Sequence, residues 1–200
     1  MDDYYGRRDK LEAALGTLMK AFTQVPTDGE SGGIHTAPEL RLFLLALAKL
    51  IGATDILETG YDSGMTVEAI DLSGARVTGV DDRSEYPGVK PEATRRLVDY
   101  PDVRLIEKEA CQYLREQADA SFDLVFVDDN HAVGHVKEEA EHIHRVLRPG
   151  GIVVFHDSSF RELYGALKEV LIGWEHIQLP TFSPVLKQNM GVAVFKKPEI

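Results

Sequence analysis

From residue 54 onward, short apolar runs alternate with longer segments whose apolar residues recur at helical spacing. The runs are Asp55–Thr59, Arg76–Val80, Val103–Ile106, Phe122–Val127 and Ile152–Phe155. This alternation is typical of repeated strand–helix–strand units, in which parallel strands form a central sheet. The runs that are apolar throughout indicate strands covered by helices on both faces. These features restrict the chain to an α/β fold.

The two ends of the chain differ from this pattern. Leucine and phenylalanine recur at helical spacing within residues 11–22 and 40–50, which predicts two N-terminal helices joined by a loop. Strands expected at 174–179 and 191–195 would end the chain as an antiparallel hairpin. Together these segments predict a Rossmann-like, doubly wound α/β fold. Its seven-stranded sheet would be mostly parallel, with an antiparallel C-terminal hairpin and N-terminal helices.

The second N-terminal helix has a start signal in Thr36-Ala37-Pro38-Glu39. A threonine followed three residues later by a glutamate can satisfy two backbone N–H groups of the first turn, so we expect Thr36 to cap this helix. A chain of 200 residues fits one domain. We expect residues 1–52 to form a helical attachment or lid and residues 53–200 to form the Rossmann-like core.

Composition limits the partners of the chain. A formal net charge of -11 argues against a nucleic-acid substrate, because such binding depends on clustered lysine and arginine. No apolar run is long enough to cross a bilayer and no cleavable signal is apparent, so we expect a cytoplasmic protein without a membrane partner. The single cysteine, Cys111, cannot form an internal disulfide and is expected to be buried. The leucine-rich N-terminal helices are compatible with a homodimer, and the oligomeric state stays open.

A glycine-containing turn follows the first strand of the predicted sheet. The stretch Glu58-Thr59-Gly60-Tyr61-Asp62-Ser63-Gly64 places two glycines where backbone can approach a ligand that a side chain would block. Asp81 and Asp82 end the second strand, where an acid can accept hydrogen bonds from both hydroxyls of a ribose. We expect six residues of this region to bind a cofactor: Glu58, Gly60, Tyr61, Gly64, Asp81 and Asp82.

The charge of the turn discriminates between cofactors. Nicotinamide enzymes seat a pyrophosphate on G-x-G-x-x-G, whereas this chain has G-x-x-x-G, and its Glu58 and Asp62 would repel the anion. S-adenosylmethionine carries an ammonium group and a sulfonium, which these carboxylates would attract. The sequence therefore predicts S-adenosylmethionine. An NAD-dependent oxidoreductase stays as an alternative that the turn disfavours.

The tract Glu58-Thr59-Gly60-x-x-x-Gly64 resembles the first motif of class I S-adenosylmethionine-dependent methyltransferases, in the variant of the O-methyltransferases that act on small molecules. The resemblance covers roughly residues 34 to 197. It implies that Asp81 binds the ribose and that Glu109 and Ala110 border the adenine.

Two later strands end in polar residues. Asp128 and His131 follow one strand, and His156 and Asp157 follow the next. Because ligands of open α/β sheets bind at the carboxyl ends of strands, we expect Asp128 to face both cofactor and acceptor. His131 and His156 are the candidate general bases, with His131 preferred. A zinc site on His131 and His135 is not expected, because no H-E-x-x-H motif or third soft ligand accompanies them.

The same strand ends resemble those of metal-dependent O-methyltransferases of the catechol type, in which two aspartates and an asparagine hold a divalent cation. The resemblance implies a Mg²⁺ site on Asp128, Asp157 and Ser158, where the serine departs from the family pattern. A cation that lowers the pKa of the acceptor hydroxyl and a histidine base are two open routes for removing its proton.

The sequence thus predicts an enzyme that transfers a methyl group from S-adenosylmethionine to a hydroxyl of a small molecule. Asp128, His131 and His156 are its candidate catalytic residues. A non-catalytic S-adenosylmethionine-binding protein is the main alternative, because Ser158 weakens the metal pattern. The identity of the acceptor and the choice between O- and N-methylation stay open.

Overall fold

The computed structural model describes residues 36–82, 90–160, 162–183 and 188–199. The predicted helix at 11–22 lies outside these residues. Among the described helices, none is long and apolar enough to cross a membrane.

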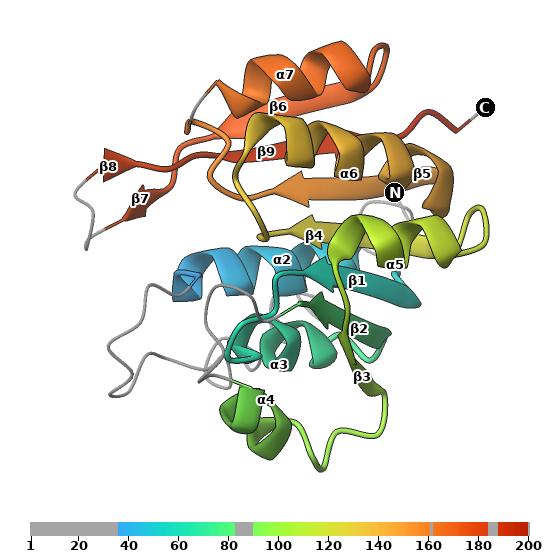
Figure 1. The fold of residues 1–200 in the computed structure, drawn as a ribbon, viewed down its shortest axis with the longest axis vertical. Coiled ribbons are helices and arrows are strands. Elements are labelled where there is room, and N and C mark those ends of the chain that lie inside the picture. The colour runs from blue at the N-terminus through green and yellow to red at the C-terminus, as the bar shows by residue number, and fades with distance from the viewer. Residues whose placement is uncertain (1–35, 83–89, 161, 184–187, 200) are drawn as a thin grey trace, which may run out of the picture.

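Seven strands form one sheet, which Figure 1 shows from β6 at the top to β3 at the bottom, in the order β3-β2-β1-β4-β5-β9-β6. The first five pair in parallel, and β9 lies antiparallel between β5 and β6. The strands are β1 (Asp55–Thr59), β2 (Arg76–Asp81), β3 (Val103–Glu107), β4 (Phe122–Val127), β5 (Leu147–Phe155), β6 (Glu175–Leu179) and β9 (Val192–Lys196). Two short strands, β7 (Phe182–Ser183) and β8 (Gln188–Asn189), pair separately. This arrangement confirms the predicted Rossmann-like sheet and its antiparallel ending.

Helices cover both faces of the sheet because successive strand residues point to opposite sides. Ile56 packs with α2, α3 and α4 on one face, and Leu57 packs with α5, α6 and α7 on the other. The helices are α2 (Pro38–Ile51), α3 (Met65–Asp71), α4 (Lys90–Arg96), α5 (Ala110–Glu116), α6 (Val133–Val146) and α7 (Leu163–Val170). The chain adds β2 and β3 on one side of β1 and then returns to add β4 and β5 on the other side, so the order of the strands reverses between β1 and β4. Ligands of open α/β sheets bind at such a reversal.

Two local expectations about element ends are wrong. The N-cap of α2 is Ala37, which makes no side-chain capping bond, and the Thr36 hydroxyl instead donates to Asp128 Oδ2 at 2.8 Å. Strand β5 begins at Leu147 rather than Ile152, because Gly150 adopts a φ of 75° and an irregular register with β4 lets the pairing continue. The first of these differences places Thr36 at the candidate site.

Candidate active site

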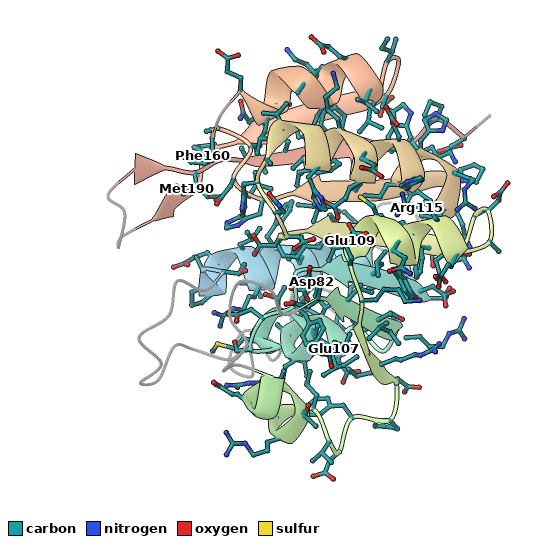
Figure 2. All side chains as sticks on the ribbon, in the orientation of Figure 1. Asp82, Glu107, Glu109, Arg115, Phe160 and Met190 are labelled. Carbon is teal, nitrogen blue, oxygen red and sulfur yellow. The ribbon has the colours of Figure 1, made fainter. Side chains whose placement is uncertain are left out.

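The carboxyl ends of β1, β2, β4 and β5 bring the predicted site residues to one edge of the sheet. Figure 2 shows Asp82, just after β2, and Glu109, just before α5, near the centre of the molecule along this edge. The cofactor candidates therefore come from neighbouring strand ends, as the parallel topology requires.

The glycine turn after β1 packs tightly against the protein itself. Gly60 and Gly64 have φ values of 81° and 80°, in the left-handed region that favours glycine. A Cβ at Gly60 would lie 2.1 Å from the carbonyl oxygen of Asp128, and a Cβ at Gly64 would lie 2.8 Å from Leu97 Cδ1. The residues that approach these glycines within the protein are those just after β4 and α4, and the cofactor-binding role of the glycines stays a prediction.

Glu58 is the most deeply buried acid of the turn, with 1% of its surface exposed. Its Oε2 atom is buried and accepts no hydrogen bond from any described residue. Burial raises the pKa of Glu58 well above its usual value, and the nearby Asp128 carboxylate raises it further, while Arg41 opposes both. Arg41 is a fully buried residue of α2 that sequence reasoning missed. The sequence feature that could have identified Arg41 is an arginine inside an otherwise apolar helical segment.

Asp81 is tied to the glycine turn. The N–H of Asp62 donates to Asp81 Oδ2 at 2.9 Å, so the turn and the end of β2 hold one another. Asp82 is exposed. Tyr61 is buried in the apolar core, where its ring packs against Gly79 of β2.

Glu109 caps α5. Its carboxylate accepts hydrogen bonds from the N–H groups of Cys111 at 2.9 Å and Gln112 at 2.6 Å. Partial burial opposes ionisation, but these two donors outweigh it and lower the pKa of Glu109. Ala110 is buried beside it.

Asp128, His131, His156 and Asp157 form a cluster, which we call the Asp–His cluster. His156 Nδ1 lies 2.7 Å from Asp128 Oδ1 and 3.4 Å from Asp157 Oδ1. His131 Nε2 lies 3.2 Å from Asp157 Oδ2 and 3.8 Å from Asp128 Oδ1. Because Thr36 donates to the second oxygen of Asp128, this carboxylate links α2 to the end of β5.

The two carboxylates set the charge of the two imidazoles. Burial alone would lower the pKa of His156, but Asp128 and Asp157 outweigh it and raise this pKa to about 9. The same competition raises the pKa of His131, with Asp157 as the largest favourable partner. The two carboxylates therefore favour the protonated form of both imidazoles in the free protein.

Ser158 engages a different part of the fold. It is buried, and its hydroxyl accepts a hydrogen bond from Gln178 of β6 at 3.0 Å. Asp157 Oδ1 is buried and, among the described residues, has no hydrogen-bond partner. The structure thus joins Asp128 and Asp157 to the two histidines, so the donor set offered to a divalent cation is a mixture of oxygen and nitrogen atoms.

Comparisons with known proteins agree with this fold. A family model described as a methyltransferase domain matches residues 57–158. A protein of Mycolicibacterium vanbaalenii that is named as an O-methyltransferase, with no acceptor in its name, is 36% identical over 131 residues. That match covers 62% of this chain and 56% of the relative, so the chain spans little more than half of the relative's length.

Solved structures of methyltransferases share the architecture. The O-methyltransferase of Bacillus cereus in complex with S-adenosylhomocysteine is 18% identical, with a TM-score of 0.63 and coverage of 94% of this chain and 91% of that chain. The O-methyltransferase TomG of Streptomyces achromogenes, in complex with S-adenosylmethionine, is 19% identical, with a TM-score of 0.64 and coverage of 92% and 89%.

The family model covers more than half of the chain, and it includes the glycine turn, the end of β2 and the Asp–His cluster. This match confirms the resemblance drawn from the motifs. The chain therefore belongs to the methyltransferase-domain family and has the Rossmann-like fold found in the O-methyltransferases compared above.

Proposed function

We propose that this protein transfers a methyl group from S-adenosylmethionine to a hydroxyl of a small molecule. The observation that supports this most is that two sets of polar side chains lie next to one another where the strand order reverses, between β1 and β4. Glu58 and Asp81 lie on the cofactor side, and the Asp–His cluster follows directly on β4 and β5. Gly60 packs on the backbone of Asp128, so the two groups are in direct contact.

The turn fits a cationic cofactor. A buried carboxyl group with an unpaired oxygen, such as Glu58, suits an ammonium donor, because burial without a partner is otherwise costly. Asp81 would accept the ribose hydroxyls, and Glu109 with Ala110 would border the adenine. When bound, S-adenosylmethionine supplies a methyl group on a positively charged sulfur.

The Asp–His cluster would position the acceptor and remove its proton. Asp128 fixes the orientation of His156 through Nδ1, and Asp157 holds His131 at Nε2. In this proposal, one imidazole of the pair loses its proton before the reaction and, in its neutral form, accepts the hydroxyl proton as the oxygen attacks. A divalent cation such as Mg²⁺ on Asp128 and Asp157 would supply the other route, by lowering the pKa of the bound hydroxyl.

Two apolar side chains, Phe160 and Met190, lie on the segments just after β5 and just before β9. Figure 2 shows Phe160 and Met190 near one another beside the β7–β8 pair. The N–H of Ser159 donates to the carbonyl of Met190 at 2.8 Å, which ties the two segments together. Together with the net charge of -11, these apolar side chains favour a small hydroxylated acceptor with an apolar part over a nucleic acid.

Calorimetry with S-adenosylmethionine, S-adenosylhomocysteine and NAD tests the cofactor. We expect the first two to bind, and Asp81→Asn to weaken them about 10- to 100-fold through loss of charge-assisted hydrogen bonds. The matched control Asp99→Asn removes an exposed carboxylate and should bind as the wild type does. Preferential binding of NAD, or equal affinity of Asp81→Asn and wild type, would refute the assignment.

A transfer assay then separates the enzyme from a non-catalytic binding protein. Release of S-adenosylhomocysteine would be followed with small phenols, alcohols and amines, each in the presence of Mg²⁺ and of a chelator. We expect turnover with hydroxyl acceptors, and a fall in kcat of about 100- to 10,000-fold in His131→Asn or His156→Asn if that histidine is the base. Tight cofactor binding without turnover on any acceptor class would favour the non-catalytic alternative.

A further inference from the structure

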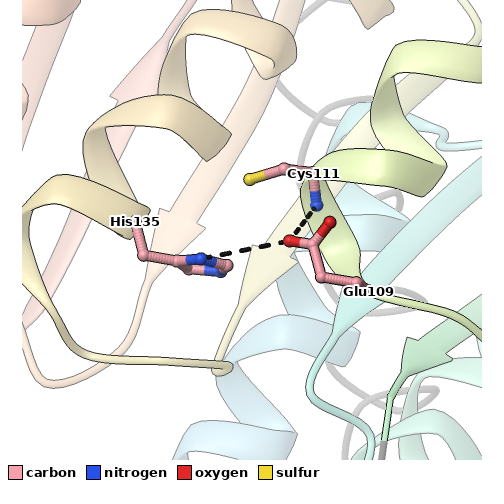
Figure 3. A group of neighbouring side chains, drawn as sticks. All are labelled: Glu109, Cys111 and His135. Carbon is pink, nitrogen blue, oxygen red and sulfur yellow. Dashed lines mark hydrogen bonds and ion pairs between the residues drawn. The ribbon is translucent and has the colours of Figure 1, made fainter.

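A second group of metal-ligating side chains lies on the α5–α6 side of the sheet, centred on His135. Asp129 follows β4, and His135 and Glu139 lie on α6. Figure 3 shows His135 pointing from α6 toward Glu109 at the start of α5, with the sulfur of Cys111 turned toward α6. We call Asp129, His135 and Glu139 the His135 cluster.

The distances within the His135 cluster fit a common cation. His135 Nε2 lies 3.3 Å from Asp129 Oδ2 and 3.6 Å from Glu139 Oε2. One atom from each residue falls within 4.8 Å of the other two. Tetrahedral zinc with bonds of about 2.0–2.2 Å separates its ligand atoms by roughly 3.3–3.6 Å, so both distances from His135 already fit and only the two carboxylates would need to approach one another.

Glu139 provides an independent indication of a ligand. It has 0% of its surface exposed, and neither of its carboxylate oxygens accepts a hydrogen bond from the described part of the chain. Burial and the charge of Asp129 raise the pKa of Glu139 to about 8, against the opposing effects of His135 and the nearby Thr59 hydroxyl. A buried carboxyl group without donors is costly unless a cation or a proton compensates it.

Carboxyl groups outnumber the cationic groups around His135, whose pKa the hydrogen bond with Asp129 raises to about 9. His135 Nδ1 faces Glu109 Oε1 at 4.0 Å, so three carboxyl groups surround one imidazole. Arg115 approaches the other oxygen of Glu109 at 4.0 Å, and its side chain is 53% exposed. That guanidinium also pairs with Glu138 at 3.0 Å, so the ion pairs described for Arg115 are with Glu109 and Glu138 and not with the His135 cluster.

We propose that Asp129, His135 and Glu139 bind a divalent transition-metal cation, with Zn²⁺ the best match for two carboxylates and one imidazole. Glu109 would orient the ring from Nδ1, the role that outer carboxylates play at histidine–metal sites. The cation would tie the first turns of α6 to the end of β4. The site is separate from the Asp–His cluster, and its existence does not depend on methyl transfer.

This assignment also changes the interpretation of the histidine spacing. His131 and His135 are four residues apart, but the sequence analysis expected no zinc site on them, because no H-E-x-x-H motif or third soft ligand accompanies them. In the structure, α6 begins at Val133, so His131 lies before the helix and faces Asp157 instead. The partners of His135 are acids from β4 and from its own helix, and no short sequence motif indicates them.

Zinc titration of the whole chain in its metal-free form, followed by calorimetry, tests the proposal. Asp157→Asn would be present throughout, so that the Asp–His cluster contributes less to binding. We expect about one equivalent of Zn²⁺ to bind, and His135→Gln or Glu139→Gln to weaken it more than about 100-fold, beyond the loss usual for an outer-shell residue. The matched control His142→Gln, on the same helix, should bind as the parent does.

Thermal unfolding checks that lost binding is not lost folding. In chelator, Glu139→Gln should unfold at or above the temperature of the parent, because a buried carboxyl group has become a neutral amide. Zinc at about 100-fold above its Kd should raise the Tm of the parent by roughly 5–10 °C and leave that of Glu139→Gln unchanged. An equal rise in both proteins, or no zinc binding by the parent, would overturn the proposal.

Cys111→Ser tests the choice of ligands. Its thiol lies within 4.8 Å of ligand atoms of Glu109 and His135, so it is the competing donor. Because the assigned ligands are on the Nε2 side of the ring, the variant should keep the zinc affinity of the parent. A loss equal to that of Glu139→Gln would overturn the assigned ligand set.

Discussion

At the scale of single residues, Gly60 and Asp128 each make contacts that hold the candidate site together. Gly60 is the clearer case, because its left-handed backbone and its contact with the Asp128 carbonyl both exclude a side chain. Asp128 is the other, since its two oxygens join Thr36 of one segment to His156 of another. Both residues therefore stabilise the arrangement of the site, whatever part they take in cofactor binding or catalysis.

Replacing Gly60 with alanine should be far more damaging than the same change at Gly74. Gly74 has a φ of 83°, but a methyl group added there would meet nothing within 4 Å, so Gly74→Ala should cost about 1–2 kcal/mol of unfolding free energy. Gly60→Ala adds a clash with β4 and should cost at least about 3 kcal/mol. Urea unfolding of both variants measures the difference, and equal losses would contradict the packing argument.

At the scale of elements, α2 forms part of the core and of the site. Leu40, Leu44 and Ala48 pack in the same core as β1 and α3, while Arg41 approaches Glu58. Thr36, just before the helix, reaches Asp128. The sequence prediction divides the chain at residue 52, but these contacts show that residues on both sides of that division form the core and the candidate site together.

Removing the Thr36 hydroxyl should reduce activity more than stability. Thr36→Val keeps the shape but leaves Asp128 with one donor fewer, and hydrogen bonds to charged groups contribute about 1.5–3 kcal/mol. If Asp128 acts in the transition state, kcat should fall about 10- to 100-fold with little change in the KM for the cofactor. Thr36→Ser keeps the hydroxyl and should restore the rate. Identical kinetics of the valine variant and wild type would argue against this positioning role.

At the scale of the whole molecule, the opposite edge of the sheet is held by charges. Arg148 forms an ion pair with Asp123 at 2.8 Å and donates to Asp55 at 3.0 Å, joining the amino ends of β1, β4 and β5. Burial opposes the ionisation of both aspartates. Hydrogen bonds from the arginines and Thr54 outweigh it and lower their pKa values.

The homodimer stays a prediction, because the first N-terminal helix lies outside the described residues.

These lowered pKa values predict a loss of stability in acid. A carboxyl group whose pKa is lower in the folded state stabilises the fold fully above its unfolded value of about 3.9, and this contribution disappears as the pH falls through the folded pKa. Asp123→Asn should therefore lose about 1–3 kcal/mol relative to wild type at pH 7, a gap that narrows below about pH 4. Urea unfolding across this range, with Asp99→Asn as the control, measures it. A gap independent of pH would exclude this mechanism.

The sequence by itself determined the order of the elements, the parallel sheet and the acids that end β2, β4 and β5. Local periodicity and the chemistry of strand ends specify these features without reference to distant residues. Only the tertiary structure showed that Ser158 turns to Gln178, that Thr36 binds Asp128 and that Asp129 and Glu139 meet at His135. These contacts join elements through packing and buried charge, which a linear pattern does not encode.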